Sequence, residues 1–443
     1  MPKISAPVTD NAPFYKGHDA FYIGVDLGTS GVRACAIDDQ KNIIHTCKTP
    51  LPAPIKDNRA ITQDANLWWQ ATEKVLHELL GHLNPNNVKA ISVNGTSGTV
   101  LVCDSQGTPL ALARMYNDAY CSEQAALIKT QAPPDSAAHG SSSGLAKLLY
   151  LQKHHPQASH LLHQADWIAG KLCGRFDISD ENNALKTGYD PQTSKWPGWL
   201  NSLNVNMNLL PAVVTPGTAI GRLKKQWASQ FKLNADCQVV SGTTDSIAAF
   251  IATGAHRPGD AVTSLGSTLV LKIISEQPVS APEFGIYSHK LGPYWLAGGA
   301  SNSGGAVLAH YFDSKKMNRL SDLVTPEKPT GLNYYPLLEK GERFPYNDAD
   351  FAPRLQPKAN SELDFFQGML EGISQIELDG YKKLQQLGAP FPTQVETTGG
   401  GSANKAWTQI RQNALGVNVT QAKFTEACYG SALLALQCMA KVE

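Results

Sequence analysis

The sequence predicts an α/β protein made of two similarly built domains that face each other across a cleft. Strand-like segments come first and then alternate with helical ones, which is typical of layered α/β domains. The 443 residues are enough for two or three domains, each with its own core. One pattern, a strand, a short turn and a second strand, occurs in both halves of the chain. We therefore expect two copies of one domain plan.

Residues 21–37 begin the first domain. Two apolar stretches, F-Y-I-G-V-D-L and V-R-A-C-A-I, flank a turn of small residues and predict a β-hairpin. A third strand is expected at 43–46, and apolar residues at helical spacing between 67 and 80 predict a helix. Residues 88–93 and 100–103 are typical of further strands. This order favours a sheet covered by helices.

The repeated pattern has L-G-T-S at 27–30 and L-G-S-T at 265–268, each between two apolar strands. Chance similarity of glycine- and serine-rich turns is the alternative explanation. A true repeat predicts two similarly built domains, and we expect the first over 20–246 and the second over 247–443, after a loose N-terminal tail at 1–19.

The composition excludes several classes of function. Lys plus Arg and Asp plus Glu both total 38, so no net charge favours binding to nucleic acid or to an anionic membrane surface. The eight cysteines have no C-x-x-C spacing, and the chain has neither a signal-peptide pattern nor an apolar run long enough to span a bilayer. We expect a soluble cytoplasmic protein, monomeric or homodimeric, that acts on small molecules.

Turns of small residues between strands let backbone N–H groups converge on an anion, although each can also be an ordinary hairpin turn. The chain lacks G-x-x-x-x-G-K-[ST] and any convincing G-x-G-x-x-G, so neither a P-loop nor a dinucleotide fold is supported. Glycine-rich segments at 298–305 and 399–404 precede helical stretches. They are candidates for binding a nucleotide, because free N–H groups at a helix start attract phosphate.

Two aspartates are candidates for chemistry. Asp245 follows the predicted strand V-V-S-G-T-T and begins a helix, where it could act as a base or simply cap the helix. Asp26 lies inside an apolar strand, and a buried carboxylate needs a partner such as a metal ion or a hydroxyl donor. Transfer of a phosphoryl group to a sugar requires a base, donors around the transferred group and Mg²⁺. The sequence contains candidates for each of these roles.

Together these motifs resemble those of the FGGY carbohydrate kinases, within the superfamily of actin and hexokinase. The matching motifs are D-L-G-T-S at 26–30 with Arg33, V-N-G-T-S-G at 93–98 with Asp104 and Gly107, N-D at 117–118, K-L-L-Y-L at 147–151, S-G-T-T-D at 241–245, L-G-S-T at 265–268 and T-G-G-G-S-A-N at 398–404. Each is weak alone, but their order and spacing are specific. The resemblance implies two actin-like (ribonuclease H-like) domains that close around ATP and a sugar.

The resemblance also implies roles for the matching residues. Asp245 would be the general base, and Asp26 would lie beside Mg²⁺ and the γ-phosphate. The sugar would be contacted by Asp26, Ser97, Asp118 and Asp245. The phosphates would be held by Gly28, Thr29, Ser30, Gly266, Ser267 and Thr268, and the rest of the nucleotide by Gly305, Gly400, Gly401 and Asn404.

Two departures from the family pattern bear on the sugar. Xylulose kinases usually carry Met-His-Gly where this chain has T-S-G at 96–98, and W-x-D-x-R becomes Y-N-D-A-Y at 116–120, without the arginine. The T-S-G segment resembles D-ribulose kinases of the cyanobacterial and plant type. The sequence therefore favours D-ribulose, phosphorylated to D-ribulose 5-phosphate, then D-xylulose, with another polyol as a further alternative.

A function of another class also fits the small-residue loops. The protein could be an actin-like ATPase, or a nucleotide-binding regulator without sugar turnover. The segment 93–98 and Asp118 favour a kinase, because an ATPase without a sugar site would not need them.

Overall fold

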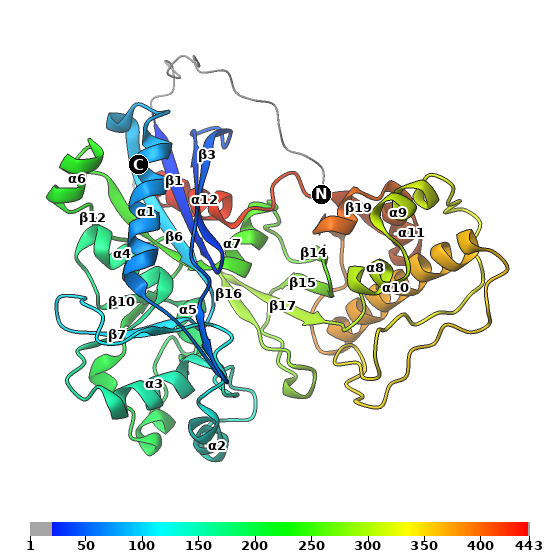
Figure 1. The fold of residues 1–443 in the computed structure, drawn as a ribbon, viewed down its shortest axis with the longest axis horizontal. Helices are drawn as coiled ribbons and strands as arrows, with labels where there is room; N and C mark the ends of the chain where they lie inside the picture. Colours follow the sequence, from blue (N-terminus) through cyan, green and yellow to red (C-terminus); the bar gives the residue numbers. More distant parts are fainter. Residues whose placement is uncertain (1–19, 442–443) are drawn as a thin grey trace.

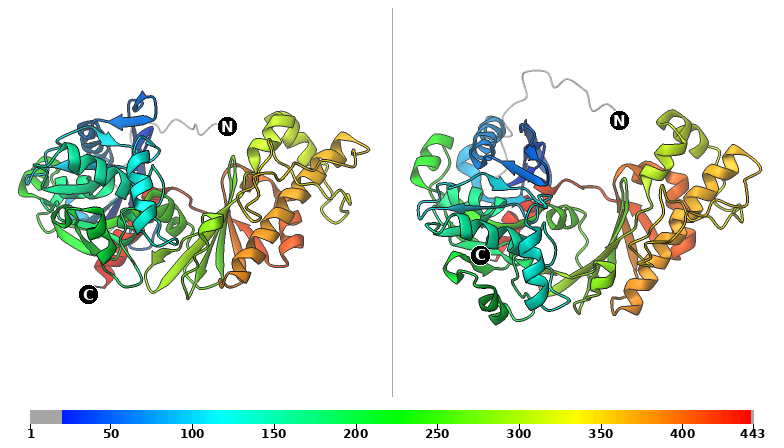
Figure 2. Two further views of the ribbon diagram at one scale, coloured as in Figure 1. Left: turned by 90° about the horizontal axis from the view of Figure 1, so that it is seen from below. Right: turned by 60° about the horizontal axis from the view of Figure 1, so that its bottom comes forward.

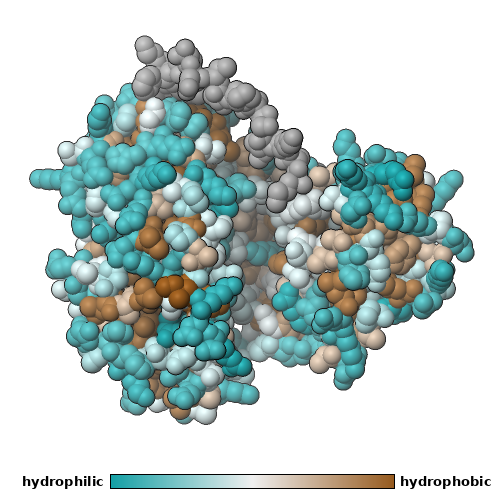
Figure 3. All heavy atoms as spheres, in the orientation of Figure 1, coloured by the Kyte–Doolittle hydropathy of each residue, from teal (hydrophilic) through white to brown (hydrophobic). Residues whose placement is uncertain are grey.

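The computed structural model describes residues 20–441, which form two lobes joined along one side with a deep hollow between them (Figures 1–3). Each lobe is built around a six-stranded sheet with helices packed against it. The predicted α/β class and the pair of similarly built domains are confirmed. The predicted tail at 1–19 lies outside the described residues.

The first lobe contains the sheet β12-β13-β6-β1-β2-β3. Its strands are β1 (Phe21–Gly28), β2 (Gly31–Ile37), β3 (Ile43–Pro50), β6 (Val88–Gly95), β12 (Ala219–Arg222) and β13 (Gln238–Thr244). The helices around it are α1 (Ala65–Leu80), α4 (Gln164–Cys173), α5 (Glu181–Leu185), α6 (Lys225–Phe231), α7 (Asp245–Ala252) and α12 (Ala427–Ala440). Helices α1 and α4 cover one face, while α7 and α12 cover the other.

A smaller sheet, β4-β5-β8-β7-β9, extends the first lobe. Its parts are β4 (Ile55–Asp57), β5 (Ala60–Gln63), β7 (Val100–Cys103), β8 (Ala113–Arg114) and β9 (His160–His163), with α2 (Ser122–Gln131) and α3 (Gly144–His154). A strand pair, β10 (Ile178–Asp180) and β11 (Ala212–Val214), lies nearby. The predicted strand at 100–103 therefore exists, but it belongs to this smaller sheet.

The second lobe contains the sheet β16-β17-β15-β14-β18-β19. Its strands are β14 (Asp260–Leu265), β15 (Leu269–Ser275), β16 (His289–Leu291), β17 (Tyr294–Ala300), β18 (Gln394–Thr398) and β19 (Asn418–Gln421). Its helices are α8 (Gly305–Tyr311), α9 (Ser314–Ser321), α10 (Glu362–Gln386) and α11 (Lys405–Leu415).

The two large sheets share one strand plan. In the first, β1 pairs antiparallel with β2 and parallel with β6; in the second, β14 pairs antiparallel with β15 and parallel with β18. The turns at 27–30 and 265–268 join corresponding strands. The repeat seen in the sequence is therefore a repeat of topology, which chance similarity of two turns would not produce.

The C-terminal helix α12 packs on the first sheet, although it follows the whole second lobe in the chain. Asn94 of β6 donates from Nδ2 to the Ala427 carbonyl (3.1 Å) and to Ser431 Oγ (2.7 Å) of α12. A Cβ at Gly24 would collide with the backbone of α12, and a Cβ at Gly430 would collide with the Ala248 backbone of α7, so glycine permits both close approaches. A boundary at residue 246 stays a prediction, and α12 lies with the first lobe.

Helix α7 joins the lobes. Its Ile247 and Phe250 form a small apolar cluster with Val262, Ile274 and Leu296 from the second sheet. The same helix packs against α12 on its other side. The start of α7, where Asp245 lies, is therefore fixed at the junction of the two lobes.

No helix among residues 20–441 is long and apolar enough to cross a membrane. All eight cysteines lie in this part of the chain and are free thiols.

Candidate active site

The first turn, at 27–30, lies at the end of the β1–β2 hairpin. Gly28 pairs with Gly31, Thr29 is half-buried and Ser30 is exposed. The Ser30 carbonyl accepts a hydrogen bond from the Leu51 N–H (3.0 Å), which fixes the turn and leaves its hydroxyls exposed at least in part. The geometry suits contact with a ligand, and the phosphate-binding role of these residues stays a prediction.

Asp26 lies in β1, two residues before this turn, and is 5 % exposed. Its Oδ2 accepts a hydrogen bond from Arg33 Nη1 across the hairpin at 3.2 Å. Burial raises the pKa of Asp26 to about 6; Arg33 opposes this rise, and the charge of Asp245 adds to it. The structure therefore places the two predicted carboxylates within electrostatic reach of each other.

The second carboxylate oxygen of Asp26, Oδ1, is buried and has no hydrogen-bond partner within residues 20–441. Mg²⁺ is commonly held by one or two carboxylates together with substrate phosphates and water. A single unpartnered carboxylate oxygen beside a phosphate-type turn fits that pattern. Asp26 can therefore supply a protein oxygen to a magnesium ion carried in with ATP.

Asp245 is the first residue of α7 and lies at the junction of the lobes. It is half-buried, and its Oδ1 accepts a hydrogen bond from the Ser246 N–H (2.6 Å). Burial raises the pKa of its carboxyl, while the Ser246 N–H, Lys272 and Lys186 oppose that rise. The cap-like bond to Ser246 uses only Oδ1, so Oδ2 can accept a proton.

Three basic residues near Asp245 were not predicted. Lys272 of β15 donates from Nζ to the Ser246 carbonyl at 2.8 Å. Lys186 ends α5 in the first lobe, and His289 begins β16 in the second. Burial, Lys272 and Lys186 lower the pKa of His289 to about 3, so this ring is neutral at physiological pH. Lys272 did have a sequence signal, as the one charged residue in the apolar strand L-V-L-K-I-I.

The second turn, at 265–268, is joined to the start of α8. The N–H groups of Gly305 and Ala306 donate to the carbonyls of Gly266 (2.8 Å) and Ser267 (3.0 Å). These N–H groups, expected to be free for phosphate, are therefore used within the protein. Ser267 is exposed and Thr268 is half-buried, so both remain accessible to a ligand.

The glycine segment at 399–404 lies against the same turn. A Cβ at Gly399 would lie 2.7 Å from the Leu265 carbonyl carbon and oxygen, and its φ is +80°. A Cβ at Gly400 would meet nothing within 4 Å, and Gly401 packs against Leu265 and Trp407. Gly400 thus offers open backbone, while its neighbours are needed for packing.

Asn404, predicted to line the nucleotide, caps α11. Its Oδ1 accepts from the Trp407 N–H (3.0 Å), and its Nδ2 donates to Ser321 Oγ (2.9 Å). Both ends of the amide therefore have partners, and a nucleotide contact by Asn404 stays a prediction.

The segment 96–98 is held by a buried lysine. Lys147 of α3 donates from Nζ to the carbonyls of Gly98 (2.7 Å), Met115 (2.7 Å) and Tyr116 (3.4 Å). Burial lowers the pKa of Lys147 to about 7. Ser97 Oγ is buried and has no hydrogen-bond partner within residues 20–441, so it can bond to a ligand that enters here.

Asp118 is fully buried, which the sequence did not reveal. It accepts hydrogen bonds from Arg114 Nη1 (3.1 and 3.2 Å), the Ile61 N–H (2.7 Å) and the Tyr120 N–H (3.3 Å). The Arg114 guanidinium lies 4.0 Å from the centre of the Tyr150 ring. With these donors on both oxygens, Asp118 has little capacity left for a sugar hydroxyl, and Arg114 supplies a guanidinium from outside the expected W-x-D-x-R position.

Glu342, to which the sequence assigned no role, fixes the loop between β17 and α8. Its carboxylate accepts from Ser301 Oγ (2.6 Å), the Asn302 N–H (2.8 Å) and Tyr335 Oη (2.8 Å). This loop belongs to the glycine-rich segment 298–305. A buried carboxylate with several donors thus shapes the backbone next to the second turn.

Models of both domains of one family match the chain. The N-terminal domain of the FGGY family of carbohydrate kinases matches residues 21–252, and its C-terminal domain matches residues 261–439. The chain belongs to the FGGY family. It is thus an ATP-dependent sugar kinase, with two actin-like domains around a cleft, as the resemblance implied.

Among curated relatives, the chain is 24% identical to a xylulose kinase of Staphylococcus epidermidis, over 93% of this chain and 87% of that protein. It is 26% identical to a xylulose kinase of Escherichia coli K12, over 88% of this chain and 84% of that protein. The solved structure of a xylulose kinase from Brucella ovis covers 96% of the chain and is itself covered to 91%, with a TM-score of 0.84 and 24% identity. These FGGY relatives are similar along almost their whole length.

Proposed function

We propose that this kinase transfers the γ-phosphoryl group of ATP to a hydroxyl of a pentulose, with Asp245 as the general base. The observation that carries the proposal is the position of Asp245, at the start of α7 between the two lobes and within electrostatic reach of Asp26. The two turns of small residues end corresponding strands of the two sheets. An acceptor hydroxyl and a phosphate chain can meet between them.

In the proposed reaction, Asp245 accepts the proton of the sugar hydroxyl through Oδ2. The hydroxyl oxygen forms the new bond to the γ-phosphorus as the bond to the ADP oxygen breaks, so one sugar phosphate and ADP result. Hydroxyls and N–H groups of the two turns offset charge on the phosphates. Mg²⁺, when bound beside Asp26, would neutralise further phosphate charge. The Asp26–Arg33 pair keeps the first turn oriented.

D-Xylulose is the first candidate acceptor, because the relatives named above are xylulose kinases. D-Ribulose, which the sequence favoured, is the second. The observation in its favour is Ser97, whose small hydroxyl, without a hydrogen-bond partner in the described part of the chain, stands where xylulose kinases usually carry histidine. The two sugars differ in configuration at C3, so one side chain beside that carbon can change the preference. A cytoplasmic location and a monomeric or homodimeric state stay predictions.

A substrate panel tests the proposal. ADP release would be measured with D-xylulose, D-ribulose, L-ribulose, glycerol and gluconate side by side. We expect the highest kcat/KM with one of the two D-pentuloses. Equal ADP release with and without every sugar would contradict the proposal and favour an ATPase without a sugar acceptor.

The role of Asp245 has its own test. Asp245→Asn should lower kcat by about 10²-fold or more, because removing a positioned base costs this much, while the KM for ATP stays nearly unchanged. Asp236→Asn is the matched control, since Asp236 pairs with Arg222 at the exposed surface of the same lobe. Full turnover in Asp245→Asn would show that another group takes the proton.

Ser97→His addresses the sugar. If the residue at 97 sets the preference, the ratio of kcat/KM for D-xylulose to that for D-ribulose should rise several-fold. An unchanged ratio, with the fold intact by thermal melting, would remove Ser97 as the reason to consider D-ribulose.

A further inference from the structure

Lys272 occupies an unusual position for a lysine. It lies within the strand β15, between residues that pack in the cores of the second lobe. Side chains alternate along a strand, so Lys272 shares a face with Ile274, which contacts α7, and with Val270 toward the second turn. The hydrogen bond from Nζ to the Ser246 carbonyl brings its ammonium to the residue next to Asp245.

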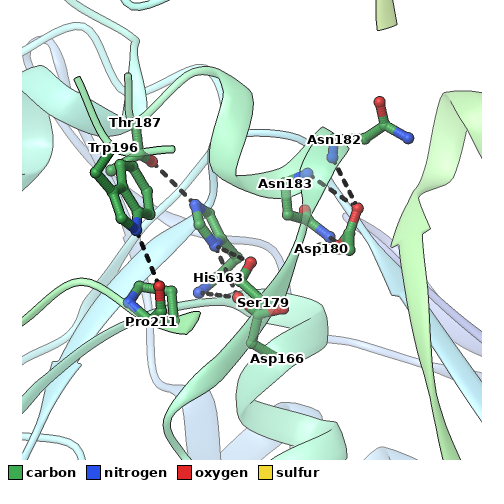
Figure 4. A network of polar contacts seen from close by, with 9 residues as sticks. All are labelled: His163, Asp166, Ser179, Asp180, Asn182, Asn183, Thr187, Trp196 and Pro211. Carbon is green, nitrogen blue, oxygen red and sulfur yellow. Dashed lines mark hydrogen bonds and ion pairs between the residues drawn. The ribbon is translucent and has the colours of Figure 1, made fainter. Parts of the chain in front are cut away.

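Lys186 reaches the same place from the first lobe. Its carbonyl accepts a hydrogen bond from the Leu145 N–H (3.0 Å). The next residue, Thr187, bonds through Oγ1 to His163 Nε2 (3.0 Å), in a buried network that also contains Asp166 and Ser179 (Figure 4). The end of α5 is therefore rigidly placed.

The side chain of Lys186 lies along the segment that carries Ser97. Its Cδ would be 3.8 Å from a Cβ at Gly98. Since Lys186 also lowers the pKa values of Asp245 and His289, its charge acts on the same small region as that of Lys272.

The charges in this region do not balance. Within residues 20–441, neither lysine forms an ion pair within 4 Å, and Arg33 already pairs with Asp26. Burial lowers the pKa of Lys272 to about 8, and among residues 20–441 Asp245 is the one carboxylate whose charge opposes this; His289 is neutral. Two ammonium groups therefore face one carboxylate, which leaves an excess of positive charge for an anion.

A small cavity adjoins Lys272. It has a volume of about 160 Å³ and is lined by Lys272, His289, Tyr287 and the glycines 298 and 299. Gly298 leaves room beside the lysine, since a Cβ there would lie 3.2 Å from Lys272 Cγ, and the lysine and the two rings supply polar surface. Val270 and Lys272, which share a face of β15 with Ile274, both line this cavity.

We propose that Lys272 and Lys186, one from each lobe, bind the phosphate group of the sugar phosphate beside Asp245. The ligand class is a phosphate monoester, which carries two negative charges after transfer. The proposal rests on the proposed function, since it places the product phosphate next to the base. Because the lysines come from different lobes, the product would be held most firmly when the lobes are together.

The test compares the binding of a pentulose with that of its 5-phosphate in the whole protein. Calorimetric titrations at constant ionic strength would use wild type, Lys272→Met and Lys186→Met. Each variant should bind the 5-phosphate roughly tenfold or more weakly, because charge-assisted bonds to phosphate are lost. Binding of the free pentulose should change less than about threefold.

Two further variants test whether the effect is specific to the position and the charge of Lys272. Lys340→Met removes a lysine that pairs with Asp350 at the surface of the second lobe, and it should bind both ligands as wild type does. Lys272→Arg keeps the charge and should recover most of the affinity for the 5-phosphate. Equal weakening for sugar and sugar phosphate in Lys272→Met would overturn the proposal, because the lysine would then read hydroxyls or hold the fold.

Two more ligands distinguish a site for the product phosphate from a site for the γ-phosphate of ATP. Inorganic phosphate should compete with the 5-phosphate in wild type and lose this effect in Lys272→Met. A non-hydrolysable ATP analogue should bind wild type and Lys272→Met with equal affinity. If Lys272→Met weakened the binding of the analogue but not that of the 5-phosphate, the lysines would contact the γ-phosphate, and the product site would be refuted. If wild type bound neither pentulose nor its 5-phosphate, the proposed function would fail. If both lysine variants bound the 5-phosphate as wild type does, only this inference would fail.

Discussion

The two large sheets share a strand plan but differ in the residue that precedes the turn between their first two strands. Two residues before the turn glycine, the first lobe has Asp26 and the second has Ser264. The first turn thus adjoins a buried carboxylate, one of whose oxygens has no partner among residues 20–441, whereas the second is surrounded by glycine backbone. The comparison teaches that the shared frame supplies the turns, and single residues decide which lobe has the charge and which offers a backbone surface.

Removing the carboxylate would make the first turn like the second. Asp26→Ser should lower kcat on the order of 10²- to 10³-fold, because the carboxylate oxygen that would hold Mg²⁺ beside the phosphates is lost. The melting temperature should not fall, since the burial that raises the pKa of Asp26 to about 6 makes its charged form costly. Ser264→Ala, the corresponding change in the second lobe, should keep kcat within a few-fold of wild type. An equal fall in kcat in both variants would show that the two turns do not differ in this way.

Adding a side chain tests the backbone surface of the second lobe. Gly399→Ala should destabilise the protein by about 1–3 kcal/mol and raise the KM for ATP, because its Cβ would lie 2.7 Å from the Leu265 backbone in a left-handed conformation. Gly400→Ala is the matched control for stability, since its Cβ would meet nothing within 4 Å. A raised KM for ATP in Gly400→Ala, with unchanged melting, would assign this open backbone to the nucleotide.

Lys147 allows a test of charge burial in the first lobe. Burial lowers its pKa to about 7 in the folded state, whereas the unfolded group titrates near 10.4. Between these values the unfolded chain binds more protons, so stability should rise with pH, by at most about 1.4 kcal/mol per pH unit. The unfolding free energy of wild type should therefore increase from pH 7 to pH 10 relative to that of Lys147→Met. Denaturant unfolding at each pH measures both values.

A flat difference across this range would mean that Lys147 keeps its proton in the folded state. Arg411, a buried cation of the second lobe, should show no such dependence, because it is paired with Glu377 at 2.6 Å and stays protonated.

The smallest effect is expected at the cap of α11. Asn404→Ala should lower stability by about 1 kcal/mol, because the bond from Asn404 Oδ1 to the Trp407 N–H is lost. Asn404→Asp keeps this oxygen and should recover most of the loss. A KM for ATP that rises equally in both variants would point to a nucleotide contact by the amide nitrogen.

Local sequence patterns were enough to predict the hairpins and the first helix, because alternation and helical spacing are properties of a few neighbouring residues. They could not show that the strand at 100–103 belongs to a separate sheet, since pairing partners lie far away in the chain. The same limit applies to Asp118, whose burial depends on the Ile61 N–H, 57 residues away. Lys272, unlike Asp118, could have been predicted, because a single charged residue in an apolar strand is visible in the local sequence. This signal was used for Asp26 but not for Lys272.

The position of α12 has a consequence for how the protein is made. The face of the first sheet that carries Asn94 is covered by a helix at 427–440, which leaves the ribosome after the entire second lobe. Until then, the nascent first lobe exposes an apolar surface that includes Tyr22, Val240 and Ala90. We expect this surface to be a binding site for chaperones during synthesis, and the first lobe to be completed only after the second has emerged.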